Sequence, residues 1–146
     1  MDIAQRELVT QLFGEWPSFH DAEVLSIELR RGKAPGEYAD LFASVLVRKY
    51  MPVNVGAAQF EMAETHNGVI LFRFRGVADV TLGGFNYQNV IDDISMTEEG
   101  KTISVVFESI FGVECSFNCV AVSVESVINK RQANASENGE NGDRFI

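Results

Sequence analysis

The clearest structural signal in the sequence is the run Val69-Ile70-Leu71-Phe72-Arg73-Phe74-Arg75. Because successive side chains of a strand point to opposite faces, Ile70, Phe72 and Phe74 are predicted to face a core. The two arginines would then lie on the opposite face. The preceding His66-Asn67-Gly68 is typical of a turn, so the strand is expected to begin after it.

Apolar and polar residues alternate in the same way on both sides of this run, which predicts further strands at residues 24–31, 38–50, 77–82 and 102–108. Pro52 is expected to end the second of these, and residues 53–63 are the least readable segment, with a weak strand at 59–62. Residues 89–97 fit a strand better than a helix, and residues 98–101 form a predicted hairpin turn.

The predicted final strand, residues 113–127, changes the parity of its apolar residues inside the segment. A bulge at residues 118–120, or burial of both faces, would reconcile its two halves. At the other end of the chain, residues 2–13 carry a helical apolar stripe, with Asp2 placed to cap the helix and Gly14 placed to end it.

Together these patterns predict a mainly β (α+β) fold. The short polar connections favour an antiparallel sheet or a two-sheet sandwich, with one N-terminal amphipathic helix. Residues 1–128 are interpreted as a single domain, and residues 129–146 as a polar, flexible tail with almost no apolar content.

The net charge of −9 restricts the kinds of partner that the protein is expected to bind. An acidic surface repels nucleic acid and anionic lipid and attracts basic proteins, although it also serves solubility alone. The start of the chain does not resemble a signal peptide, and no apolar run approaches the length of a membrane span. A cytoplasmic location is therefore expected.

Two cysteines, Cys115 and Cys119, lie on one predicted strand. Four strand residues place their Cα atoms roughly 13 Å apart, too far for a disulfide. Buried free thiols are expected, and two cysteines without a second pair give little support to a zinc site. We predict no metal and no cofactor.

A compact polar and aromatic motif, Trp16-Pro17-Ser18-Phe19-His20-Asp21-Ala22-Glu23-Val24, precedes the first predicted strand. Its functional interpretation is a metal or acid/base site of His20, Asp21 and Glu23, with His66 as a distant fourth member. The favoured interpretation is structural, since the motif lacks the spacing of a known ligand set. In that interpretation Pro17, Ser18 and Asp21 build a turn and His20 is hydrogen-bonded to the backbone, while Trp16 and Phe19 fill the core.

A second cluster, residues 84–89, combines Phe85 and Tyr87 with three amides. Such composition suits a protein interface or a carbohydrate groove, although the amides could equally satisfy neighbouring backbone groups. A Gly-rich phosphate loop and a nucleophile with a base in reach are not recognisable, so no catalytic residue is predicted.

The Trp16–Val24 motif resembles the opening of the immunity protein 50 family of bacterial polymorphic toxin systems. The segments Phe72-Arg73-Phe74-Arg75-Gly76-Val77 and Phe85-Asn86-Tyr87-Gln88-Asn89-Val90-Ile91 are also similar to that family. The resemblance extends over residues 14–127. It implies a non-enzymatic antidote that binds a cognate bacterial toxin and blocks it.

An acidic antidote would suit a basic toxin. We therefore predict an immunity protein that occludes its toxin, with an unknown oligomeric state. The predicted contact residues are Asn86, Tyr87, Gln88, Glu98 and Glu99. The alternatives are a small metal-dependent hydrolase or isomerase using His20, Asp21 and Glu23, and a ligand-binding β module whose groove includes Tyr87 and Gln88.

Overall fold

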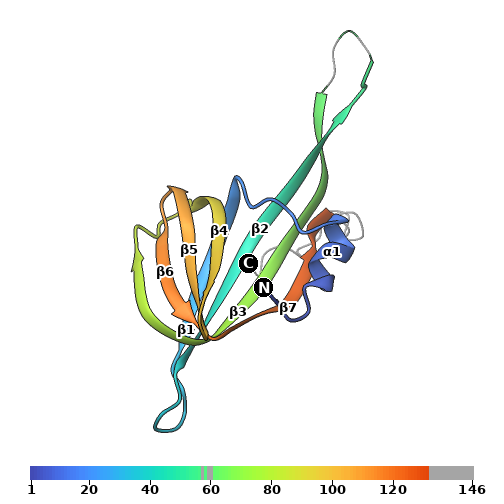
Figure 1. The fold of residues 1–146 in the computed structure, drawn as a ribbon. Helices are drawn as coiled ribbons and strands as arrows, with labels where there is room; N and C mark the ends of the chain where they lie inside the picture. Colours follow the sequence, from blue (N-terminus) through green and yellow to red (C-terminus); the bar gives the residue numbers. More distant parts are fainter. Residues whose placement is uncertain (57, 59–60, 132–146) are drawn as a thin grey trace.

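The computed structural model describes residues 1–131 except residues 57, 59 and 60. The described residues form one short helix and seven strands, which confirms the mainly β prediction (Figure 1). The elements are α1 (Glu7–Phe13), β1 (Ala22–Arg30), β2 (Ala39–Val53), β3 (Glu61–Gly83), β4 (Val90–Glu99), β5 (Thr102–Phe111), β6 (Glu114–Cys119) and β7 (Ala121–Asn129).

All strand pairings within the sheet are antiparallel, and the strand order is β2-β1-β4-β5-β6-β3-β7. An additional pairing joins β2 to β3, so six of the strands close into a ring. The long strand β3 makes this possible because its second edge pairs with β7 over Gly68–Arg75 and with β6 over Ala78–Gly83. Of the two architectures predicted, the single sheet is the one observed.

The interior of the closed sheet holds the apolar residues that the alternation of apolar and polar residues predicted. Ile70, Phe72 and Phe74 on β3 are fully buried, as are the alternating apolar residues of β2 from Leu41 to Val47. The ring of Phe74 lies 4.9 Å from that of Phe117, edge-on, and 5.9 Å from that of Phe72. Such contacts add to the stabilisation that comes from burying the rings.

The turn predicted at His66-Asn67-Gly68 is wrong, because these residues lie inside β3 and pair with Lys49, Arg48 and Val47 of β2. A packing requirement explains the glycine. A Cβ atom at Gly68 would lie 2.6 Å from the Leu12 side chain, so glycine lets α1 approach the sheet.

The predicted break at Pro52 is also wrong, since β2 continues to Val53 and Pro52 pairs with Met62. Proline lacks an N–H donor but is tolerated where one edge of a strand has no partner. Among the described residues, β2 beyond Leu46 pairs only with β3. The two strands project from the body as a ribbon (Figure 1). Of the weak strand predicted at 59–62, residues 59 and 60 lie outside the described residues.

The predicted strand at residues 24–31 is β1, with a bulge that the alternation did not predict. The register shifts between Val24 and Ser26, so Leu25 is the additional residue. Val24 consequently pairs with Val45, and Ile27 pairs with Ala43. The bulge changes the phase of the apolar residues, and the buried residue near the start of β1 is Val24 rather than Leu25.

The single strand predicted at residues 113–127 is two strands, β6 and β7, separated at Val120. The backbone N–H of Val120 donates to the carbonyl oxygen of Arg75, 2.8 Å away, where β3 changes partner from β7 to β6. Gly76 has φ +66° there, and a Cβ atom would lie 2.7 Å from Val120 Cγ2. The change of parity therefore marks a corner of the sheet.

The helix is shorter than predicted. It begins after Arg6, and Asp2 does not cap it, whereas Gly14 ends it with φ +82° and donates its N–H to the Thr10 carbonyl. Ala4 instead forms a parallel bridge to Ser123, donating its N–H to the Val122 carbonyl. The backbone hydrogen bonds of this segment thus favour an extended conformation beside β7 over a first helical turn.

Cys115 and Cys119 are buried and free, as predicted. Burial raises the pKa of both thiols to about 11, which disfavours the reactive thiolate at neutral pH. The predicted tail lies outside the described residues from residue 132 onward, and Asn129 is the last residue of β7. No helix within the described residues is long and apolar enough to span a membrane.

Candidate functional site

The Trp16–Val24 motif connects α1 to β1 and packs against the core. The Trp16 ring lies 5.9 Å from that of Phe19 and 6.2 Å from that of Phe72. Pro17 and Phe19 are buried, and the Arg6 guanidinium lies 5.0 Å from the centre of the Trp16 ring. The apolar half of the motif therefore fixes the position of the polar half at the surface.

The polar half forms a tight turn at the start of β1. Asp21 adopts a left-handed conformation, φ +64°, which asparagine and aspartate tolerate better than most residues. Its N–H donates to the Ile91 carbonyl on β4, and the His20 N–H donates to Ser18 Oγ at 3.2 Å. The turn thereby presents His20 and Asp21 to solvent beside β4.

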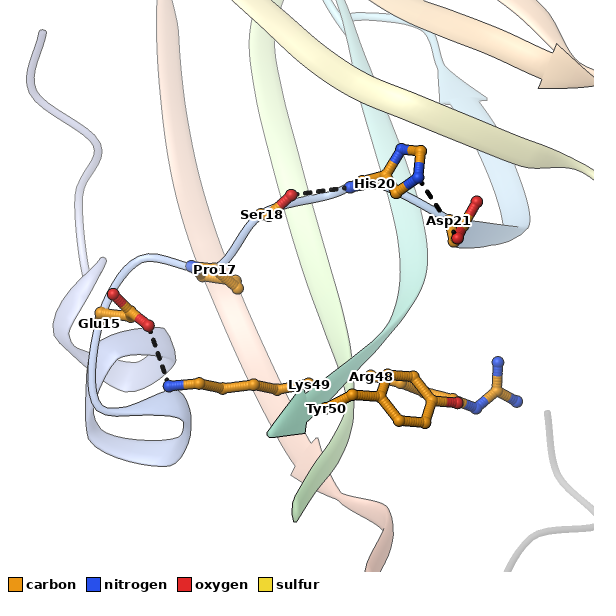
Figure 2. Close-up of a pocket in the computed structure, with 8 residues that line it drawn as sticks. All are labelled: Glu15, Pro17, Ser18, His20, Asp21, Arg48, Lys49 and Tyr50. Atoms are coloured by element: carbon orange, nitrogen blue, oxygen red, sulfur yellow. Dashed lines mark hydrogen bonds and ion pairs between the residues drawn. The ribbon is translucent and has the colours of Figure 1, made fainter. Parts of the chain in front are cut away.

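A surface pocket of about 420 Å³ lies between this turn and β2 (Figure 2). Its lining residues are Glu15, Pro17, Ser18, His20, Asp21, Arg48, Lys49 and Tyr50. Lys49 Nζ lies 2.9 Å from Glu15 and donates to the carbonyl oxygen of Phe13 at 3.0 Å. This contact joins β2 to the C-terminal end of α1, where a cation is favoured by the helix dipole.

The imidazole of His20 lies between two carboxylates. Its Nδ1 is 2.6 Å from Asp92 Oδ1 on β4, and its Nε2 is 3.5 Å from Asp21. The hydrogen bond with Asp92 and then the charge of Asp21 raise the pKa of His20 above 6.5. Sequence reasoning missed Asp92, although the adjacent Asp92-Asp93 at the start of a strand is a visible feature of the sequence.

Replacing Asp92 with asparagine is expected to lower the pKa of His20, because a neutral amide replaces the charged partner of the hydrogen bond that most favours the imidazolium. NMR titration of the imidazole signals measures the change. Asp93→Asn, which alters the next carboxylate along β4, is the matched control. An equal shift in the control would show that general surface charge, and not the hydrogen bond, sets the pKa.

The same interaction makes stability depend on pH. Because the folded state raises the pKa of His20, its stabilising contribution is complete below the ordinary value of 6.5 and is lost as pH rises through the raised value. The stability difference between the unmodified chain and His20→Ala should therefore shrink with rising pH.

Of the other residues of the proposed metal site, Asp21 lies beside His20, whereas Glu23 and His66 have other neighbours. In the described part of the chain, no group of three or more His, Cys, Asp or Glu side chains could hold a metal ion. Glu23 pairs through its backbone with Leu46 and Val90, between two neighbouring strands. His66 is near Thr65, 2.8 Å from its hydroxyl, and its ring lies 6.1 Å from that of Phe13.

The loop before β4 is ordered by the buried side chain of Asn89. Its Oδ1 accepts hydrogen bonds from the N–H groups of Asn86 and Val113, at 2.9 and 3.1 Å, and its Nδ2 donates to the Asn86 carbonyl. The Gln88 N–H donates to Asn86 Oδ1, while the Tyr87 side chain is 89% exposed. The side chains of Asn86 and Asn89 therefore satisfy backbone groups, and Tyr87 projects into solvent.

The predicted contact residues form two separate groups. Asn86, Tyr87 and Gln88 precede β4, whereas Glu98 and Glu99 lie at its far end. A ten-residue strand is roughly 30 Å long, so one small patch does not contain both groups.

Carboxylates dominate the surface that β4, β5 and β6 contribute. Between residues 90 and 119 there are six carboxylates and one cation, Lys101. Asp93 lies directly opposite Glu108 in the register, and Glu108 accepts a hydrogen bond from Ser95 Oγ at 2.6 Å. Like charges placed opposite one another destabilise a sheet, so a bound cation would relieve this pair.

These observations define the class of protein: a small α+β protein built on one antiparallel sheet, with ordered polar and aromatic groups at its surface. The family model for immunity protein 50 matches residues 5–129. The chain therefore belongs to the immunity protein 50 family, as the sequence motifs predicted. No curated protein and no solved structure is significantly similar to it.

Proposed function

We propose that this protein neutralises a cognate bacterial toxin by binding it and covering its active site or an adjacent surface. The observation that carries the proposal is membership of an immunity protein family over nearly all the described chain. Binding by occlusion needs no cofactor and no chemistry on the toxin. The complex would form in the cytoplasm, where the toxin would otherwise act.

The charge distribution supports a basic toxin. The surface of β4, β5 and β6 concentrates carboxylates, and the nearest cation in sequence, Lys101, lies in the turn after β4. A field of one sign accelerates association with an oppositely charged partner and repels nucleic acid. The loop with Asn86, Tyr87 and Gln88 would contact the toxin, while Glu98 and Glu99 would add to its electrostatic attraction.

A metal-dependent hydrolase is the less supported function. Histidine must be neutral to bind a metal, whereas Asp92 and Asp21 favour the protonated form of His20. The geometry thus supports a surface ion-pair group that orients the turn between α1 and β1. Metal analysis of protein purified without an affinity tag tests this choice, and near-stoichiometric metal would favour the hydrolase.

Co-expression with the toxin encoded beside this protein tests the proposal. Growth should be restored, and the two proteins should co-purify. An inactive toxin variant gives the baseline for growth and should still co-purify, because occlusion depends on the binding surface and not on turnover. If growth is not restored and the two proteins do not co-purify, the proposed antidote function is contradicted.

A further inference from the structure

An apolar opening leads from the surface toward the core between β1 and the C-terminal part of β3. Leu82 pairs directly with the buried Cys115, and Ile27 pairs directly with the buried Ala43. Directly paired residues point to the same face of a sheet, so both side chains face inward. The side chains of Leu82 and Ile27 therefore extend the apolar core to the surface at this opening.

The opening exists because β1 has few partners on this side. It pairs with β4 only at Ala22 and Glu23, after which the loop before β4 runs beside it. A pocket of about 310 Å³ remains, lined by Leu25, Ser26, Ile27, Leu82 and Phe85. Leu82 is 43% exposed and Phe85 44% exposed, so a cluster of apolar side chains remains accessible.

The wall of this pocket is preorganised. Gly84, beside Phe85, has φ +67°, and a Cβ atom there would lie 2.4 Å from the carbonyl oxygen of Gly112. Asn89 ties the same two turns together through its hydrogen bonds to Asn86 and Val113. Little backbone freedom remains to be lost at Phe85 when a partner binds, which favours affinity.

Two carboxylate residues lie next to the pocket residues in the strand register. Glu114 pairs with Gly83 at the end of β3, and Glu23 pairs with Val90 beside the start of the pocket on β1. Arg30, the one cation on β1, is neutralised by an ion pair with Glu28. An apolar centre with carboxylates on adjacent paired residues complements an apolar side chain flanked by lysine or arginine.

We infer that this pocket is the docking site for the toxin, and that a basic surface of the toxin inserts one apolar side chain between Leu82 and Phe85. The inference rests on the proposed function and adds the site and the chemistry of the partner. Binding would bury Phe85 at the centre of the interface and place Glu23 and Glu114 against cationic side chains.

The test measures binding of the purified cognate toxin by calorimetry. Phe85→Ala should weaken binding by about tenfold or more, as expected for a central aromatic anchor. Tyr38→Ala, at a 69% exposed aromatic residue outside the sheet pairings, is the matched control and should bind as the unmodified chain does. Thermal unfolding of each variant shows that its fold is retained.

A second variant keeps the inference testable if Phe85→Ala fails to fold. Glu114→Lys changes an exposed side chain on β6, opposite Gly83, and should weaken binding severalfold, with a reduced dependence on salt. Unchanged affinity in both folded variants overturns the inference, while toxin binding by the unmodified chain would still support the proposed function. A dimer of this protein that Phe85→Ala dissociates would assign the pocket to a second copy and also overturn it.

Discussion

Phe74→Ala is expected to lower the free energy of unfolding by about 3–5 kcal/mol, which is a large part of the stability of an ordinary domain. Phe74 is fully buried on β3, and its ring contacts those of Phe72, Phe107 and Phe117. Removing it loses the transfer free energy of the ring and leaves a cavity that the closed sheet cannot readily fill.

Urea unfolding of Phe74→Ala, followed by Trp16 fluorescence, measures this loss. Trp16 is the only tryptophan and contacts Phe72, so its emission reports on the core. Phe85→Ala removes the same number of atoms from a half-exposed position and should cost much less. A loss below about 1 kcal/mol at Phe74 would contradict the core described above.

Asn89→Ala is expected to cost about 2–4 kcal/mol, because it leaves the N–H of Val113 buried without its acceptor and also frees Asn86. The two turns joined by Asn89 should loosen together. Hydrogen exchange should therefore speed up at residues 84–89 and at Val113, while the amides of β2 keep their protection.

Asn118→Ala is the control for that experiment, because Asn118 makes an exposed hydrogen bond to Asp79 on a neighbouring strand. It should change stability by much less than Asn89→Ala. Equal losses in the two variants would show that burial of the Asn89 amide is not what orders the loop. If the docking pocket is as inferred, Asn89→Ala also weakens toxin binding.

The sequence predicted those elements whose local pattern agrees with their place in the sheet. Alternation identified the inward residues of β2 and β3, and Glu98–Lys101 was correctly expected to turn between β4 and β5. The errors at His66–Gly68 and Pro52 have a common cause. A glycine or proline indicates a turn locally, but here the approach of α1 and the unpaired edge of β2 explain them.

The site was less predictable because its residues meet through pairings of distant segments. His20 contacts Asp92 only because β1 lies beside β4. The sequence between His20 and Asp92 does not indicate that these two strands pair. The pocket at Phe85 likewise depends on where β1 and β3 remain unpaired. Strand order determines both features, and local periodicity contains no information about strand order.

The bridge between Ala4 and β7 has a consequence for the order of events during synthesis. Ala4 exchanges hydrogen bonds with Val122 and Val124, so the first residues of the chain must wait for β7, the last of the described strands. Until β7 leaves the ribosome, β3 lacks a neighbour along Gly68–Arg75 and exposes an edge to aggregation. Completion of the fold would then lag behind translation by the time that non-local pairing takes.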